Sequence, residues 1–143
     1  MEVEKIEQIL KKLHIFLADA LPEVLILKNH VLGVSMPETG IVLIKDGTID
    51  APEYILSSAE ETVLYTHRVQ LDILVQSIDA ATRDQKSSDL LKSVVDVLSP
   101  KESLFDGLVE GFFFGVPVFT LEVGDDGIAI KIVTLEISLQ YYL

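Results

Sequence analysis

The sequence contains no cysteine, which excludes disulfide bridges and thiolate metal sites and leaves the redox compartment open. Arginine is scarce, because Arg68 and Arg83 are the only examples in the chain. Proteins that grip nucleic acid need clustered arginine and lysine, whereas the formal net charge of this chain is -12. The composition therefore argues against direct nucleic-acid binding.

Long apolar runs and a basic leader are also missing. The best candidate for a membrane span, residues 15–27, is interrupted by Asp19, Pro22 and Glu23, whereas a spanning helix needs about twenty apolar residues in succession. The first residues, Met1 to Lys5, lack the basic start and apolar run of a secretory signal. We expect a soluble protein located in the cytoplasm.

No spacing typical of a catalytic or metal site is present. The histidines are His14, His30 and His67, and none has a partner at metal-ligand spacing. We interpret His14 and His67 as structural. Gly107, Gly111 and Gly115 match neither a dinucleotide fingerprint nor a P-loop. Asp125-Asp126 is interpreted as part of a turn rather than a calcium loop. We assign no catalytic, cofactor-binding or metal residue, and expect no enzyme.

Apolar residues make up 49% of the 143 positions, and the mean hydropathy is +0.41 despite the strong negative charge. A chain of this length forms one domain by default, here residues 1–143. Apolar content beyond the needs of one small core predicts burial at subunit interfaces. The alternative is that the charge only keeps an apolar protein soluble.

Helical periodicity predicts two amphipathic helices. The first carries its apolar residues at Val3, Ile6, Leu10, Leu13 and Leu17. It should end before Pro22, because proline disfavours helix at the preceding residue. The second starts at about residue 80, if Asp79 caps it, or at about 83, if Thr82 does. This second helix ends at Leu98, ahead of Pro100.

A long strand is predicted over residues 63–78, where apolar and polar residues alternate with period two. At about 3.3 Å per residue it would span roughly 50 Å, and the usual strand has five or six residues. Such a strand bends or projects toward another subunit. Shorter runs predict further strands at residues 24–27, 41–44, 116–123 and 128–141.

Turn chemistry connects these strands. Lys45-Asp-Gly-Thr48 predicts a tight reversal, because Asp-Gly tolerates positive φ, and Ile49 is a candidate start of a return strand. Residues 51–59 are interpreted as a loop or an irregular edge. Pro117 belongs at the start of its strand or on an edge. Residues 124–127, Gly-Asp-Asp-Gly, predict a hairpin turn.

The last strand changes phase, since its apolar residues lie at even positions up to Ile132 and at odd positions from Val133. Either a β-bulge shifts the buried face at this point, or a central strand is covered on both faces. The predicted fold is α+β, an antiparallel or mixed sheet with two main helices packed on one face, in the order α-β-β-β-α-β-β.

The chain resembles the tail terminator, or tail completion, proteins of long-tailed bacteriophages. The resemblance covers residues 1–143 in element order and is concentrated in residues 63–111. It rests on the strand Val69–Gln76, the turn Asp79–Asp84, the following helix, the stretch Leu104–Gly111 and a final strand. The residues Phe105-Asp106 and the run Phe112–Phe114 depart from the family pattern.

The resemblance implies a non-enzymatic homo-oligomer, a ring of about six subunits at the neck of a virion tail. Such a ring caps the tail tube protein, stops its polymerisation and provides the head-tail joint to the connector or neck protein. DNA would pass through an acidic lumen without specific binding. No membrane and no cofactor are implied, and assembly would take place in the host cytoplasm.

Two alternatives stay open. Type III secretion chaperones are also small acidic α/β proteins, which dimerise and bind an extended effector segment. They usually close with an amphipathic helix, whereas this sequence closes with a predicted strand ending Leu139-Gln-Tyr-Tyr-Leu143. An enzyme with a site assembled from scattered carboxylates and His67 has no support from any residue spacing.

Overall fold

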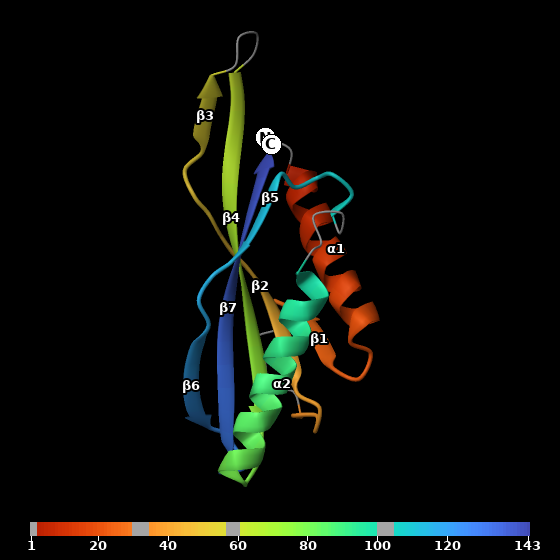
Figure 1. Cartoon of the computed structure of the whole chain (residues 1–143), viewed down its shortest axis with the longest axis vertical. Helices are drawn as coiled ribbons and strands as arrows, with labels where there is room; N and C mark the ends of the chain where they lie inside the picture. The colour runs from red at the N-terminus through yellow and green to blue at the C-terminus, as the bar shows by residue number, and fades with distance from the viewer. Residues whose placement is uncertain (1–2, 30–34, 57–60, 100–104) are drawn as a thin grey trace.

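The computed structural model describes residues 3–29, 35–56, 61–99 and 105–143, and these form two helices and a seven-stranded sheet (Figure 1). The helices are α1 (Val3–Ala20) and α2 (Ala80–Leu98). The strands are β1 (Leu25–Lys28), β2 (Ile41–Ile49), β3 (Glu53–Leu56), β4 (Glu61–Gln76), β5 (Gly111–Phe114), β6 (Val118–Val123) and β7 (Ala129–Tyr142). The α+β class is confirmed, and the structure adds β3 and β5 to the predicted order.

The two longest strands form the centre of the sheet. β4 and β7 run antiparallel and pair without a register shift from Leu64 opposite Tyr142 to Gln76 opposite Ile130. β2 and β3 line the free side of β4, while β5 and β6 line the free side of β7. β1 pairs in parallel with β2, so the sheet is mixed.

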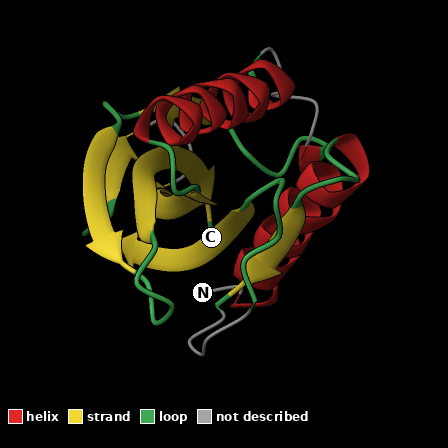
Figure 2. Cartoon of the chain, turned by 90° about the horizontal axis from the view of Figure 1, so that it is seen from below, coloured by secondary structure: helices red, strands yellow, loops and turns green. Residues whose placement is uncertain are grey.

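Both helices lie on one side of the curved sheet (Figure 2). α1 ends at Ala20, two residues before Pro22, as predicted. α2 is capped by Asp79, whose carboxylate accepts from the backbone N–H of Thr82 at 2.9 Å and from its hydroxyl at 2.6 Å. The first of the two predicted caps is therefore the one used. Pro100 lies outside the described residues.

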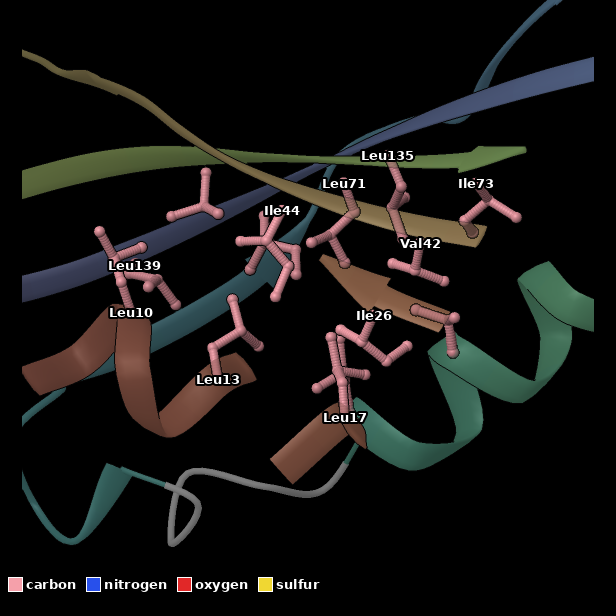
Figure 3. Packing of buried hydrophobic residues seen from close by; sticks show 14 of the residues in the cluster. Leu10, Leu13, Leu17, Ile26, Val42, Ile44, Leu71, Ile73, Leu135 and Leu139 are labelled. Carbon is pink, nitrogen blue, oxygen red and sulfur yellow. The ribbon is translucent and has the colours of Figure 1, made fainter. Parts of the chain in front are cut away.

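The core lies between the helices and the inward side chains of the sheet (Figure 3). Figure 3 labels Leu10, Leu13 and Leu17 of α1, Ile26 of β1, Val42 and Ile44 of β2, Leu71 and Ile73 of β4, and Leu135 and Leu139 of β7. The odd positions of β4 from His67 to Val75 are all buried, which confirms the predicted alternation. One face of β4 therefore packs into the core.

The predicted reversal at residues 45–48 is wrong, because β2 continues through it to Ile49. Its register against β4 shifts between Lys45 and Thr48, which is a β-bulge. Gly47 has a φ of +68°, and a Cβ on it would lie 1.7 Å from the carbonyl oxygen of Arg68. The positive φ typical of Asp-Gly is used here to insert one extra residue into a continuous strand, rather than to turn the chain.

Of the two alternatives for the last strand, the bulge is wrong, since β7 pairs with β4 without interruption, and β7 is a central strand of the sheet. Lys131 shares the parity of buried Val133 and therefore points to the helix side. Its ammonium lies 3.1 Å from the carboxylate of Asp84 on α2 and 5.3 Å from the ring centroid of Phe119. The apparent phase change thus arises from a lysine at an inward position of a central strand. Its ammonium is stabilised there by an ion pair with Asp84 and a cation–π contact with Phe119.

β3 and the first residues of β4 form a hairpin, here named the arm (residues 53–56 and 61–64), which extends beyond the other strands in Figure 1. The residues of β4 before Leu64 have no partner on β7. The segment predicted as a loop or irregular edge contains β3, which pairs only with β4 in the described sheet. Residues 57–59 of that segment lie outside the described residues.

Candidate functional site

Two of the three histidines serve the fold, and His30 lies outside the described residues. The His14 Nε2 lies 3.0 Å from the carbonyl oxygen of Ile26, so it ties α1 to β1. His67 is buried, with Nδ1 2.8 Å from the hydroxyl of Tyr141 and Nε2 bonded to the backbone carbonyl of Asp46. Because a carbonyl only accepts, Nε2 carries the proton and Nδ1 accepts from the tyrosine hydroxyl.

This arrangement suits a neutral imidazole. Burial lowers the pKa of His67, although the hydrogen bond to the Asp46 carbonyl and the negative charge of Asp46 oppose the shift. Burial also raises the pKa of Tyr141 to about 12. Both groups therefore stay uncharged near neutral pH and join β4 to β7 and to the β2 bulge. The interpretation of His67 as structural agrees with this geometry.

The side of the sheet away from the helices carries a polar cluster. Asp72 is 6% exposed. It accepts from Gln70 Nε2 at 3.0 Å and from the hydroxyl of Thr134 at 2.9 Å, and it pairs with Lys45 Nζ at 2.6 Å. These three partners bond both carboxylate oxygens of Asp72, so the cluster links β2, β4 and β7.

Both arginines are occupied within the chain. Arg68 donates from Nε to Asp50 at 2.8 Å and from Nη1 to Glu136 at 2.9 Å. Arg83 donates from Nη1 to the carbonyl of Ser77 at 3.2 Å. Arg68 is thus paired with two acids, whereas Arg83 contacts a neutral carbonyl and its Nε has no partner among the described residues. For Arg68, the geometry agrees with the compositional argument against nucleic-acid binding.

Asp126 of the predicted hairpin turn is also used by the fold. Its carboxylate accepts from the N–H of Ile128 at 2.9 Å and from Gln76 Nε2 at 3.0 Å. Gly127 has a φ of +80° and donates to the carbonyl of Gly124, so the turn is confirmed. Within the described ranges, no three histidine or acidic residues are grouped so that they could hold a metal ion.

The most unusual surface feature is an edge of the sheet that bears large apolar side chains. All six residues of β6 are exposed. We name as the β6 surface its apolar members and one preceding residue, which are Val116, Val118, Phe119, Leu121 and Val123, each more than half exposed. Exposed apolar residues scattered singly are ordinary, whereas Phe119, Leu121 and Val123 lie on one face of β6 and form a continuous apolar row, which is typical of an interaction site.

One signal for this surface is readable from the sequence, whereas its exposure on both faces is not. Pro117 predicts a strand start or an edge, and β6 is an edge strand that begins one residue later. The apolar residues of β6 occupy both parities, which is typical of a strand covered on both faces. Only the tertiary structure shows that neither face is covered in the described chain, since α2 packs on β4 and β7.

Comparison with known proteins identifies no family. No family model and no curated protein matches the sequence. Among solved structures, a chain from the virion of a native gene transfer agent particle is similar over 89% of this chain and 84% of its own length, with 10% identity and a TM-score of 0.41. A second solved protein, without a descriptive name, is similar over 100% of this chain and 99% of its own length, with 13% identity and a TM-score of 0.49. Neither similarity establishes a shared function.

Proposed function

We propose that this protein is a non-enzymatic structural part of a phage-like virion, a tail terminator that forms a ring of about six copies. The ring would seat on the last ring of the tail tube, stop its polymerisation and offer a joint to the head connector. It would act at the neck of the tail after assembly in the host cytoplasm. None of the described helices is long and apolar enough to cross a membrane.

The observation that carries this proposal is the arm. The residues of β4 that precede Leu64 have no partner on β7 and pair with β3 alone. A two-stranded hairpin is only marginally stable by itself in water, so an arm that leaves the body of the sheet gains most if a neighbour covers it. Repeated from one subunit to the next, such a contact is head-to-tail, and a ring results where the rotation closes.

The charge distribution fits the passage of DNA through a ring. The net charge is -12, and Arg68 is paired with Asp50 and Glu136. The exposed surface of α2 presents Asp89 together with Asp84 and Asp96, which form ion pairs with Lys131 and Lys92. A bore lined by such groups would repel phosphates and let the duplex slide. A ring whose bore proved neutral or basic would contradict this part of the proposal.

The proposal expects a tail-tube gene beside the gene for this chain. The test is direct observation of rings by negative-stain electron microscopy, on the purified protein alone and with the product of that gene. Rings of about six copies, or caps at the ends of tubes of limited length, are the expected result. Absence of rings under both conditions would refute the proposal. A secreted-effector gene as the neighbour would favour the chaperone-like alternative.

A shortened-arm variant separates assembly from folding. Replacing residues 55–62 by Asn-Gly keeps the pairs of Glu53 and Tyr54 on β4 and closes the strands with a favoured two-residue turn. We expect the circular dichroism spectrum and the urea midpoint to be kept and rings to be lost. Ser88→Ala, at an exposed position of α2, is the control that should keep both. Rings from the shortened variant would show that the arm is not the contact.

A further inference from the structure

The outer edge of β6 is open in the described structure. β6 pairs with β7 on one side and with no strand on the other. Exposed edges of native sheets are usually blunted by charged side chains, proline or a bulge, because they pair readily with other strands. Within β6, Glu122 is the only charged residue, and Pro117 lies before the strand rather than in it. This edge is thus equipped for pairing.

The backbone groups that face outward can be assigned from the hairpin turn. The N–H of Gly124 donates to the carbonyl of Ile128, and the hydrogen-bonded pairs of an antiparallel ladder alternate with non-bonded ones. Glu122, Thr120 and Val118 therefore bond to β7. It follows that Phe119, Leu121 and Val123 direct their N–H and C=O groups away from the sheet.

The sequence of β6 is complementary to itself when two copies run antiparallel with Leu121 opposite Leu121. On the helix side, Phe119 then faces Val123 of the second copy, so every pair is apolar. On the other side, Thr120 faces Glu122 of the second copy, and no two acids are opposed. The outward groups supply about six backbone hydrogen bonds, two for each of three pairs. Apolar and hydroxyl–carboxylate cross-strand pairs are favourable.

From this match we infer that β6 is a self-pairing edge, through which the free protein forms a two-fold dimer with one sheet running across both copies. The same edge is used by both copies, so the contact closes at two and leaves no open β6 edge. The interface is small compared with the roughly 1,200 Å² of a stable complex, and we expect a micromolar dissociation constant. A ring needs a different, head-to-tail contact, so this inference does not rest on the proposed function.

The absence of native cysteine allows a test that reads the register. Thr120→Cys and Glu122→Cys are made as separate single variants, mixed in equal amounts and oxidised. In the inferred register Thr120 opposes Glu122 as a non-bonded pair, with the short separation that a disulfide needs. Each variant alone places its thiols about 7–8 Å apart on the diagonal. The mixture should therefore cross-link several-fold more than either variant alone.

A cysteine remote from the edge provides the background, since Lys92 is highly exposed on α2, and Lys92→Cys should stay at chance level. Equal cross-linking in all samples, or none above this background, would overturn the inference. Analytical ultracentrifugation of the unmodified chain should show a concentration-dependent dimer. A monomer at all concentrations up to about 1 mM, far above a micromolar constant, would also overturn it.

A backbone variant tests the pairing itself. Leu121→Pro removes an outward N–H, which edge positions tolerate, and should weaken dimerisation about thirtyfold through the loss of the paired hydrogen bonds. Leu121→Ala measures the contribution of the Leu121 side chain to dimerisation. Phe119→Asp places a charge among apolar partners at the edge, and it serves as the second test if Leu121→Pro fails to fold. Unchanged dimerisation in both Leu121→Pro and Phe119→Asp would refute the inference. Rings without any dimer would refute it while leaving the tail-terminator proposal intact.

Discussion

Gly47 is the position at which one added methyl group should be most damaging. Its φ is +68°, and a Cβ would lie 1.7 Å from the carbonyl oxygen of Arg68 across the bulge. Gly107 is a matched control, since its φ is +80° and no atom lies within 4 Å of the added Cβ. Gly47→Ala and Gly107→Ala share a backbone penalty, and they differ in the clash.

The magnitude follows from these two terms. A non-glycine residue in the left-handed region costs about 1–2 kcal/mol, which is the whole expected effect of Gly107→Ala. At Gly47 the Cβ must also gain more than about 1 Å of clearance, because real Cβ contacts below 3.0 Å essentially never occur. Parting β2 from β4 would break about two hydrogen bonds, at about 1 kcal/mol each. Gly47→Ala should therefore cost about 3–4 kcal/mol.

Urea unfolding followed by circular dichroism measures both variants. The midpoint should fall further for Gly47→Ala, with an unchanged slope if the unfolding stays two-state. Equal losses would refute the reasoning, because they would show that β2 and β4 are not held together at this point. That result would instead favour an open reversal at residues 45–48, where the added methyl group meets only solvent.

Three further predictions concern buried polar groups. Because the pKa of His67 is lowered, its contribution to stability is present above about pH 6.5 and is lost as the pH falls. On acidification the unmodified chain should therefore lose more stability than His67→Gln, by at most about 1.4 kcal/mol per pH unit. Parallel profiles of urea midpoint against pH for the two proteins would contradict this. Asp72→Ala should cost about 2 kcal/mol in urea unfolding, because Thr134 loses its acceptor. Asp96→Ala, at the exposed ion pair with Lys92, should cost under about 1 kcal/mol. Lys131→Met should stay within about 1 kcal/mol of the unmodified chain, and a thermal or urea measurement showing a loss above about 3 kcal/mol would mean that the lysine is required at its inward position.

The helices and the long strand were predictable because their signals are local. Pro22 and Asp79 act within one turn of the residues whose conformation they decide, and the alternation in β4 reflects one buried face along a single strand. Gly47 was misread for a physical reason. Asp-Gly permits positive φ in a turn and in a bulge alike, and the choice between them is made by β4, which lies far away in sequence.

Lys131 and β6 show a second limit of local patterns. An inward lysine breaks the period of two, and its acceptor Asp84 belongs to a helix 47 positions earlier in the chain. The apolar residues of β6 are equally compatible with a buried central strand and with an open edge. Which strands are central is decided by the pairing order of the whole sheet, so the β6 surface could be located only from the structure.

The unbroken ladder between β4 and β7 has a consequence for how the chain reaches its fold. Every pair in this ladder joins residues more than about fifty positions apart, and ordering such a long intervening loop must precede the stabilisation that the contacts provide. During synthesis, β4 leaves the ribosome well before its central partner exists, with the apolar face of β4 uncovered. We expect slow folding, in milliseconds to seconds, and a nascent chain that depends on protection from aggregation until residue 142 has been added.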